Sequence, residues 1–304
     1  KIISELGEDT RQIFLTNFES AEIAKYLEII DSDDGADILS ELSPEVRNET
    51  ILSISDKEKS KNLKDLLQYD DDVAGGLMAK ELVKCNINWK INQCIDLIKK
   101  QAEKVSRIYS VYVTDNKGEL LGKVSLKDII VASDNSRIKD IYDDYVISVD
   151  SKMNQEEVAI IMQKYDLDVL PVINKRGKLL GRITIDDIVD FIKDEAEKDY
   201  QMASGISEDV EASDSVWTLT RARLPWLLIG MIGGMLGAEV IGIFDIRENF
   251  ELAFFIPLIA AMGGNVGVQS AAIVVQGLAN DSLKLDSIFS KLIKELGVGL
   301  LNGI

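Results

Sequence analysis

The stretch VYVTDNKGELLGKVSLKDII (residues 111–130) returns 59 residues later as LPVINKRGKLLGRITIDDIV (residues 170–189). Both copies carry LLG, a basic residue, an aliphatic residue and a hydroxyl residue, with an aspartate three positions after the hydroxyl. Each copy predicts a strand, a glycine turn, a second strand and a helix that begins at the hydroxyl residue. Repeats at such a period usually stack on one another, so we expect an α/β core built from two copies.

A helix is also expected before each copy, over Asn92–Lys104 and Asn154–Lys164, from the spacing of apolar residues. These elements resemble the tandem cystathionine-β-synthase (CBS) module, a regulatory module, which we place at residues 78–203. The resemblance implies that the hydroxyl and aspartate positions can hold an adenosine nucleotide such as ATP. The competing interpretation is that they only cap helices and support first turns. The residues that would bind the nucleotide are Ser125, Asp128, Thr184 and Asp187, and Lys127 could pair with one of its phosphates.

Residues 1–77 predict an all-helical, acidic domain of short antiparallel helices. Apolar residues recur there at helical spacing and are interrupted by acidic turns such as DSDDGAD (residues 31–37). The stretch from Lys1 to Ser20 is expected to be a polar helix rather than a signal peptide. Gly75 and Gly76 predict a turn between this domain and the first repeat.

The composition restricts the chemistry. The 304 residues carry 34 Lys and Arg against 52 Asp and Glu, a net charge of -18, with no His and two Cys. This acidic surface disfavours nucleic acid. The absence of imidazole argues against zinc, copper or iron sites and excludes His-dependent catalysis. No enzyme activity is expected, because no catalytic domain remains once the helical domain, the CBS module and the membrane segment are assigned. A bound metal would have oxygen ligands, which favours Mg²⁺, Ca²⁺ or Mn²⁺.

The last 80 residues predict an α-helical transmembrane segment over 225–304, attached to the multidomain acidic front. Pro225–Phe244 and Leu252–Val275 are each long enough to span a bilayer, and a third span starts near Leu292. Residues 204–224 are expected to connect the CBS module to the membrane, with a plug-like helix over Glu208–Arg223.

The charges that flank these spans predict their orientation. Arg221 and Arg223 precede the first span and lysines follow the second, whereas the loop DIRENFE between the spans is mainly acidic. By the positive-inside rule, the basic ends face the cytoplasm. We therefore expect a multi-pass protein of the cell (inner) membrane whose N-terminal domains are cytoplasmic.

The second span contains the unusual motif MGGNVGVQSA (residues 262–271). Polar residues within a span usually mark an ion pathway or a helix interface. Two carboxamides one turn apart share one face of a helix, where their oxygens can contact a hydrated cation. The alternative is a hydrogen bond between helices. The candidate pore residues are Gly264, Asn265, Gly267 and Gln269.

The order of features resembles the MgtE-type magnesium transporter family. A helical acidic domain, AGGLM (74–78), a CBS pair, a connecting segment, PWL (225–227) and GGNVGVQS (263–270) follow one another. The resemblance implies a homodimeric Mg²⁺ channel in the inner membrane with five membrane helices per subunit. Two spans and the start of a third are visible in this sequence, and the second span is implied to line the pore.

The resemblance also implies regulatory Mg²⁺ sites between the soluble domains. Clustered carboxylates repel one another when empty, whereas Mg²⁺ bridges them and favours a compact, closed state. The competing interpretation of the acidic helix is a solvated surface. Two further functions stay open: a CBS-gated transporter of another divalent cation, and a nucleotide-sensing membrane regulator. The implied Mg²⁺ ligands are Asp34, Asp37, Glu156, Asp166, Asp187, Asp190, Glu195 and Asp199.

Overall fold

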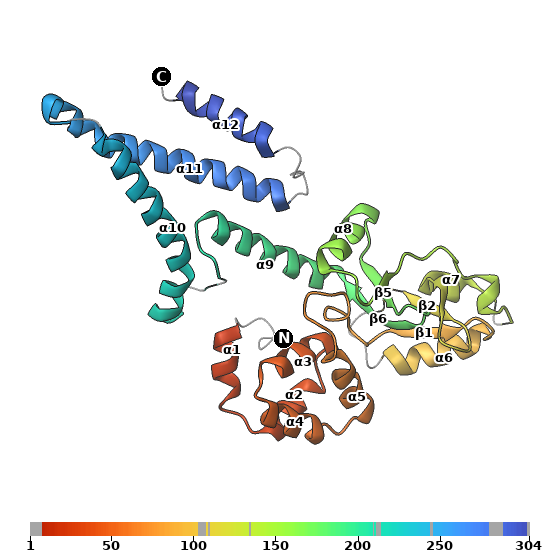
Figure 1. The fold of residues 1–304 in the computed structure, drawn as a ribbon. Helices are drawn as coiled ribbons and strands as arrows, with labels where there is room; N and C mark the ends of the chain where they lie inside the picture. Colours follow the sequence, from red (N-terminus) through yellow and green to blue (C-terminus); the bar gives the residue numbers. More distant parts are fainter. Residues whose placement is uncertain are drawn as a thin grey trace. The chain divides into compact units, whose positions relative to one another are not determined.

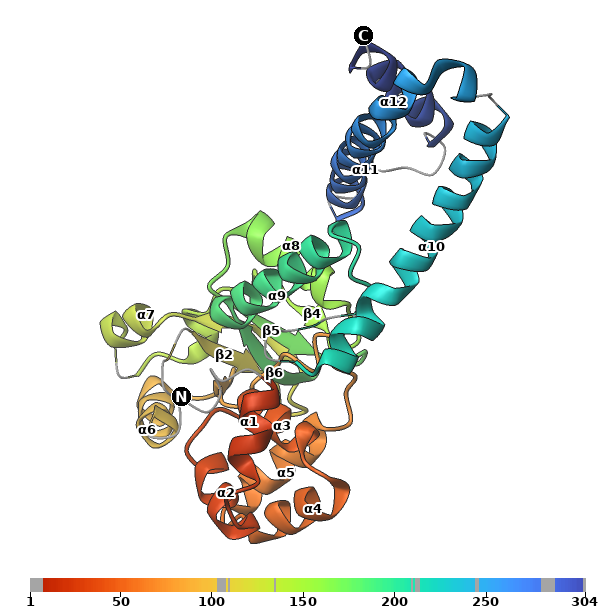
Figure 2. The same ribbon diagram turned by 90° about the vertical axis from the view of Figure 1, so that its left-hand side faces the viewer.

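The computed structural model describes residues 8–102, 108, 110–133, 135–208, 210, 214–243, 246–279 and 288–302. The chain divides into two compact units, Lys1–Phe191 and Ile192–Ile304. The first unit contains the helical domain and the repeats, and the second contains the long apolar helices (Figures 1 and 2). The expected multidomain architecture is confirmed.

The N-terminal domain is a bundle of short helices, as the sequence predicts. Two of them begin at side-chain caps: Ser43 accepts a hydrogen bond from the Val46 amide, and Asp56 accepts from the Glu58 and Lys59 amides. The expected polar helix is shorter than predicted because it ends at Leu15. The helices are α1 (Glu8–Leu15), α2 (Ser20–Leu27), α3 (Ser32–Glu41), α4 (Pro44–Ser53) and α5 (Lys57–Leu66).

The first repeat folds around one three-stranded sheet in the order β1-β2-β3. β1 pairs parallel with β2, and β2 pairs antiparallel with β3. The helix expected from Asn92 begins one residue earlier, and the last two residues of that prediction lie outside the described residues. The elements are β1 (Val83–Asn86), α6 (Ile91–Ala102), β2 (Val111–Thr114), β3 (Leu120–Val124), α7 (Leu126–Val131) and the 3₁₀ helix η1 (Ile138–Asp140).

The second repeat has the same topology, in the order β4-β5-β6. Its helix α8 begins just after Asn154, whose side chain accepts a hydrogen bond from the Glu156 amide. Gly118 and Gly177 take positive φ angles of 83° and 75° in the equivalent turns, which explains the glycine in each copy. The elements are β4 (Val149–Asp150), α8 (Gln155–Tyr165), β5 (Val169–Ile173), β6 (Leu179–Thr184) and α9 (Ile185–Ala203).

The glycine of each LLG motif allows the backbone of another segment to approach closely. A Cβ at Gly122 would lie 2.2 Å from the Asp143 carbonyl oxygen, and one at Gly181 would lie 2.6 Å from the Ala79 carbonyl oxygen. Ala79 exchanges two backbone hydrogen bonds with Arg182, at 2.8 and 2.9 Å. The segment that leaves the N-terminal domain therefore lies along the edge of the second repeat.

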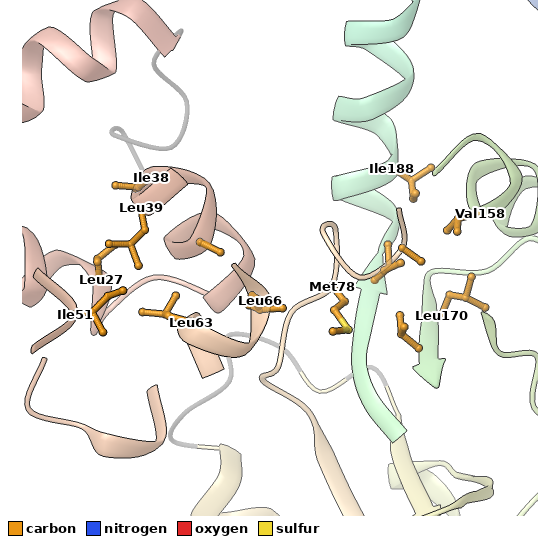
Figure 3. Close-up of a cluster of buried hydrophobic side chains, with 14 of the residues drawn as sticks. Leu27, Ile38, Leu39, Ile51, Leu63, Leu66, Met78, Val158, Leu170 and Ile188 are labelled. Atoms are coloured by element: carbon orange, nitrogen blue, oxygen red, sulfur yellow. The ribbon is translucent and has the colours of Figure 1, made fainter. Parts of the chain in front are cut away.

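One apolar core runs from the N-terminal domain into the second repeat. Leu27, Leu39 and Leu63 form its helical part, Met78 of the connecting segment is fully buried, and Leu170 lies in the repeat (Figure 3). The first repeat has a core of its own around β1, β2 and α6. The helical domain is thus packed against the second repeat by continuous hydrophobic burial, the main favourable term in folding.

The second unit corrects the predicted connecting helix. Among the described residues, the segment after α9 is not helical until Val216, where Ser215 caps α10 by accepting a hydrogen bond from the Thr218 amide. α10 (Val216–Gly242) then continues past Pro225 as one helix. The plug-like helix predicted over Glu208–Arg223 is therefore wrong at residues 208, 210, 214 and 215, whereas residues 209 and 211–213 lie outside the described residues. Its second half is the start of the first span.

The apolar helices are long enough to cross a bilayer. Val216–Gly242 and Phe250–Gly277 have mean hydropathies of 1.7 and 1.6, and the most apolar stretch of each is not buried by other parts of the chain that the structure describes. The second span differs from its prediction because its first residues belong to a 3₁₀ helix rather than to the α-helix. The remaining elements are η2 (Ile246–Phe255), α11 (Ile256–Ala279) and α12 (Ile288–Asn302).

Candidate functional site

The acidic run of the N-terminal domain forms the start of α3. Asp31 is the N-cap residue, and Asp33 and Asp34 lie in the first turn. The Asp33 carboxylate accepts a hydrogen bond of 3.0 Å from the Asp34 amide. Acidic residues stabilise a helix N-terminus, because the free amides carry partial positive charge. Helix formation by itself therefore concentrates carboxylates at this end of α3.

A second carboxylate is held at the start of α9 by the repeat motif. Asp187 Oδ2 accepts hydrogen bonds from the Thr184 hydroxyl at 2.6 Å and from the Thr184 amide at 2.9 Å. Thr184 is buried at the end of β6. The hydroxyl and aspartate that recur in the repeat therefore fix the direction of the Asp187 side chain.

The carboxylates of α3 and α9 raise one another's pKa values. Burial raises the pKa of Asp33 well above its usual range, and the nearby charges of Asp187 and Asp34 add to the rise. Burial also raises the pKa of Asp187, with Asp186 and Asp34 contributing, although the hydrogen bonds from Thr184 oppose the shift. Like charges from two domains are thus held together at low hydration.

The acidic surface continues along α3 to Asp37. Desolvation raises the pKa of Asp37 to about 7, and the charges of Asp34 and Asp71 add to the effect. Burial, followed by the charge of Asp31, also raises the pKa of Asp34. We call Asp33, Asp34, Asp37 and Asp187 the acidic interface.

The acidic interface fits a hydrated divalent cation. Its donors are carboxylate oxygens, which suit Mg²⁺ and Ca²⁺. Among the described residues, no three His, Cys, Asp or Glu side chains converge closely enough to form a ready-made metal site. Mg²⁺ usually keeps several of its waters and takes few protein ligands, so spaced carboxylates suit it better than a site that requires full dehydration.

Of the eight predicted Mg²⁺ ligands, Asp34 and Asp37 lie one turn apart on α3, and the charge of Asp34 contributes to the raised pKa of Asp187. Glu156 lies in the first turn of α8, whereas Asp166 caps its far end with φ 51°. These two are about 15 Å apart along the helix axis at 1.5 Å per residue, so they cannot share one ion within a chain. Asp190 is exposed on α9.

Glu195 and Asp199 lie in the part of α9 that belongs to the second unit. Glu195 Oε2 lies 3.8 Å from Lys198 Nζ. Sequence reasoning missed Asp33, because the run DSDDGAD offers four aspartates that local pattern cannot rank. The sequence feature that could have identified Asp33 is its position in the first turn of α3, after the N-cap residue.

The nucleotide candidates are held as the helix-cap interpretation predicts. The Ser125 hydroxyl donates to Asp128 Oδ2 at 2.6 Å and accepts from the Asp128 amide at 3.0 Å. This pair matches Thr184 and Asp187 in the second repeat. Ser125, Lys127 and Asp128 are exposed, whereas Thr184 is buried. The two repeats therefore present the same motif in different surroundings.

The pore candidates lie together in the middle of α11. Asn265 and Gln269 are one turn apart and exposed in the chain. A Cβ at Gly264 or Gly267 would have no heavy atom within 4 Å. This part of α11 therefore offers a small, polar surface that another helix or an ion path can occupy.

Family models match the helical domain, the repeats and the last part of the chain. Residues 1–72 match the family described as MgtE intracellular N domain, and residues 73–135 and 138–194 match CBS domains. Residues 256–304 match the MgtE family described as divalent cation transporter, which is not an enzyme class. The chain belongs to the MgtE family.

Individual members of the MgtE family are similar to this chain in sequence. The chain is 35% identical to the magnesium transporter MgtE of Thermus thermophilus, over 79% of this chain and 54% of the relative. It is 39% identical to that of Enterococcus faecalis, over 81% and 54%. The chain thus spans about half the length of these curated relatives.

A solved structure gives the same result for the soluble region. The cytosolic domain of an Mg²⁺ channel MgtE, in complex with ATP, superposes with a TM-score of 0.58 and 32% identity. The match covers 62% of this chain and 77% of that one. The fold of the N-terminal domain and the repeats is therefore shared with a member of the family.

The raised pKa of Asp37 predicts a stability that depends on pH. Its folded value of about 7 lies above the ordinary 3.8, so folding takes up a proton. This contribution grows as pH falls through 7 and is lost as pH rises. The other raised carboxylates act in the same direction, whereas the lowered pKa of Glu81 matters only near or below its ordinary 4.5.

In chelator, the thermal unfolding midpoint should therefore be higher at pH 6 than at pH 8. The variant Asp37→Asn should reduce this difference, and Glu45→Gln, in α4, should retain it. Scanning calorimetry at both pH values measures the effect. Equal midpoints for the wild type would contradict the raised pKa values of these carboxylates.

Proposed function

We propose that this chain is the sensor and the first part of the pore of a Mg²⁺-selective, Mg²⁺-gated channel for magnesium uptake. It acts as a homodimer in the inner membrane, with its N-terminal domains in the cytoplasm. The observation that supports this most is the acidic interface, where Asp33 and Asp34 of one domain meet Asp187 of another. Membership of the MgtE family supplies the cation that such an interface would sense.

Repulsion between these carboxylates is the basis of the proposed gate. At low cytoplasmic Mg²⁺ the like charges favour separation of α3 from α9, and bound hydrated Mg²⁺ neutralises them and favours the closed state. Shifting the ratio of closed to open channels from 1:99 to 99:1 requires roughly 5.5 kcal/mol of differential binding. One bound ligand typically contributes a coupling free energy of about 1–3 kcal/mol. More than one ion per subunit is therefore expected to act.

The route from sensor to pore runs along α9 into α10. After α9, the Ser207 amide and hydroxyl both donate to the Ala222 carbonyl, at 2.9 and 2.8 Å. Glu208 pairs with Arg221 at 3.3 Å. Gly205 lies so close to Trp226 that a Cβ there would meet the ring at 2.3 Å. The segment after α9 is thus fastened to α10 on both sides of Pro225.

A nucleotide role is a second candidate, because the related cytosolic domain was solved in complex with ATP. Ser125, Lys127 and Asp128 are accessible in the first repeat, and Thr184 is the matching buried hydroxyl. ATP would then act as a second cytoplasmic ligand of the same module, alongside Mg²⁺.

Removing Asp187 should desensitise the gate. With about 1–3 kcal/mol of coupling lost per ion, Asp187→Asn should raise the Mg²⁺ concentration that halves flux by roughly 5- to 150-fold. Asp128→Asn is the matched control, because it changes the equivalent aspartate of the first repeat, which is exposed. Flux into reconstituted vesicles is measured as cytoplasmic-side Mg²⁺ is raised. The same shut-off concentration for wild type and Asp187→Asn would refute this role.

The carboxamides of α11 should control conduction rather than gating. We expect Asn265→Ala to lower Mg²⁺ flux at low cytoplasmic Mg²⁺ by about tenfold or more, because the amide oxygen would contact the hydrated ion in the pore. The concentration that closes the channel should not change. Parallel flux assays with Mn²⁺, Co²⁺ and Ca²⁺ test the alternative of another divalent cation. Unchanged Mg²⁺ flux would exclude Asn265 from the ion path.

ATP binding can be tested separately. Calorimetry should detect ATP binding by the wild type, and Asp128→Ala should weaken it by about tenfold, as expected for the loss of a hydrogen bond to a ribose. Glu157→Ala, an exposed carboxylate on α8, is the control. No heat of binding by the wild type would remove the nucleotide role and leave Mg²⁺ sensing untouched.

A further inference from the structure

A row of carboxylates on α3 ends at an ion pair inside the N-terminal domain. Asp34, Asp37 and Glu41 follow one another at spacings of three and four residues, so they share one face of the helix. The first two belong to the acidic interface. Glu41, the last residue of α3, pairs instead with Arg11 of α1. A fixed cation therefore lies one helical turn beyond Asp37.

The contact between Arg11 and Glu41 is forked and largely buried. Arg11 Nε donates to Glu41 Oε2 at 3.0 Å, and Arg11 Nη2 donates to Glu41 Oε1. The side chain of Gln12 also donates to the Glu41 carbonyl, at 3.1 Å. The side chains of Arg11 and Glu41 are only 14% and 7% exposed. Because both carboxylate oxygens accept from one planar guanidinium, Glu41 is held in a fixed direction by its partner.

The helix that carries Arg11 is part of the folded N-terminal domain. Leu15, the last residue of α1, is 3% exposed and lies in the same hydrophobic core as Leu39 of α3. In the proposed gate, the N-terminal domain moves relative to the second repeat. Arg11 then stays beside Asp34 and Asp37, so its charge acts on them in the open and in the closed state.

The charge of Arg11 reaches the carboxylates of the acidic interface. Burial raises the pKa values of Asp34 and Asp37, and the positive charge of Arg11 opposes that rise at both residues. At Asp37, Arg11 lowers the pKa by more than Glu41 raises it. A cation that stabilises these carboxylates in the absence of metal also repels a metal ion that approaches them.

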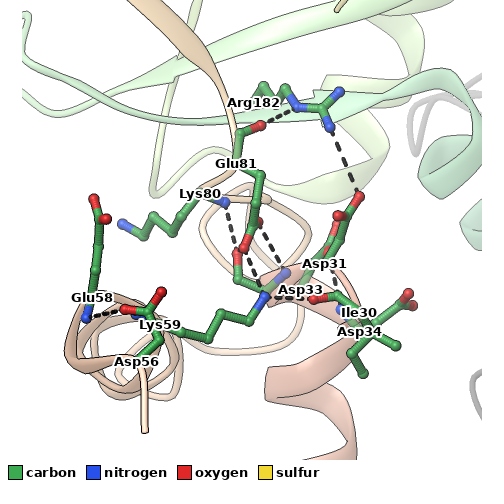
Figure 4. A network of polar contacts seen from close by, with 11 residues as sticks. Ile30, Asp31, Asp33, Asp34, Asp56, Glu58, Lys59, Lys80, Glu81 and Arg182 are labelled. Atoms are coloured by element: carbon green, nitrogen blue, oxygen red, sulfur yellow. Dashed lines mark hydrogen bonds and ion pairs between the residues drawn. The ribbon is translucent and has the colours of Figure 1, made fainter. Parts of the chain in front are cut away.

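Lys59 is a second cation of the N-terminal domain beside α3, but it is engaged elsewhere (Figure 4). Its Nζ pairs with Glu81 at 2.7 Å, and the two side chains are 10% and 11% exposed. Ser32 also donates to Glu81, from its amide at 3.0 Å and from its hydroxyl at 2.7 Å. At Asp34, the charge of Lys59 has a smaller effect than that of Arg11. Of these two cations, Arg11 therefore has the greater influence on the row of carboxylates.

We infer that Arg11 is a built-in counter-cation that sets the Mg²⁺ affinity of the acidic interface. It keeps Glu41 from extending the row of oxygen donors by one turn beyond Asp37. Its charge also weakens the attraction of the row for a hydrated divalent ion. The acidic interface therefore fills at a higher Mg²⁺ concentration than the same carboxylates would without Arg11. This inference rests on the proposed Mg²⁺ sensing.

Three variants of this pair form a cycle of charges. Arg11→Gln leaves Glu41 as an added carboxylate and should lower the Mg²⁺ concentration at half-saturation by about tenfold, as expected for one charge within a helical turn of the ion. Glu41→Gln leaves Arg11 without this partner and should raise that concentration by a similar factor. The double variant restores the net charge and should return it to within about threefold of wild type.

Mg²⁺ binding is measured by calorimetry on the full chain in lipid nanodiscs, at pH 8 and constant ionic strength. Asp37, whose pKa is raised by burial to about 7, is mainly ionised at that pH. Lys25→Gln, at an exposed position of α2, changes the net charge as Arg11→Gln does and should keep the wild-type midpoint. Arg11→Lys keeps the charge but loses the forked contact, so its midpoint should stay nearer to wild type than that of Arg11→Gln.

The two single variants decide the role of Arg11. Wild-type midpoints for both would overturn it. A shift of both in the same direction would also overturn it, because a damaged fold moves both variants alike whereas the charge moves them apart. Circular dichroism checks that each variant is folded. If Arg11→Gln is unfolded, Glu41→Gln decides alone, and a midpoint at or below that of wild type contradicts the inference.

Flux assays separate this result from the proposed gate. If cytoplasmic Mg²⁺ fails to close the wild-type channel while the binding midpoints of the two single variants diverge, the gate fails and the role of Arg11 stands. If Mg²⁺ closes the channel and the midpoints coincide, the gate stands and the role of Arg11 fails. No Mg²⁺ binding by the wild type would overturn both.

Discussion

The carboxylates of Asp33 and Asp187 are held near each other, at low hydration, by two domains that share one hydrophobic core. Continuous apolar packing from Leu27 to Leu170 fixes α3 beside the start of α9, and the repulsion between the aspartates opposes that packing. Coulomb energies rise steeply as water is excluded, so a charge mismatch here has more effect than one on the open surface. A cation that restores neutrality stabilises the arrangement that the core already favours.

Attraction and repulsion alternate along one turn of α3. Asp31 pairs with Arg182 and Ser32 binds Glu81, whereas Asp33 meets Asp187. Because attraction and repulsion oppose each other at this interface, the free energies of its joined and separated states are similar. An equilibrium between states of similar free energy responds to a few kcal/mol of ligand binding. An interface with repulsion alone would separate completely, and the ion would then have to restore both position and charge.

Repetition made the CBS module predictable, since two copies with the same glycine, hydroxyl and aspartate specify the same turns and caps. The place of Asp187 beside Thr184 at the start of α9 was predicted for that reason. Asp33 was not singled out, because only tertiary packing distinguishes it from the other aspartates of DSDDGAD. The connecting helix was misplaced because residues 204–208 form a turn with Gly205 at φ 78°, and the Ser215 cap starts the next helix late. Local composition did not reveal that contacts with α10 order this turn.

In the proposed gate, those contacts would carry a change at Asp187 to α10. α9 is one unbroken helix, about 28 Å long at 1.5 Å per residue, that begins at Ile185, two residues before Asp187, and ends at Ala203. The turn after it binds Ala222 and Arg221, just before Pro225. Proline cannot donate to the Arg221 carbonyl, so the helical ladder of α10 is weakest there. In the proposed gate, a movement of α9 would therefore act on α10 where the hydrogen-bond ladder of α10 is weakest.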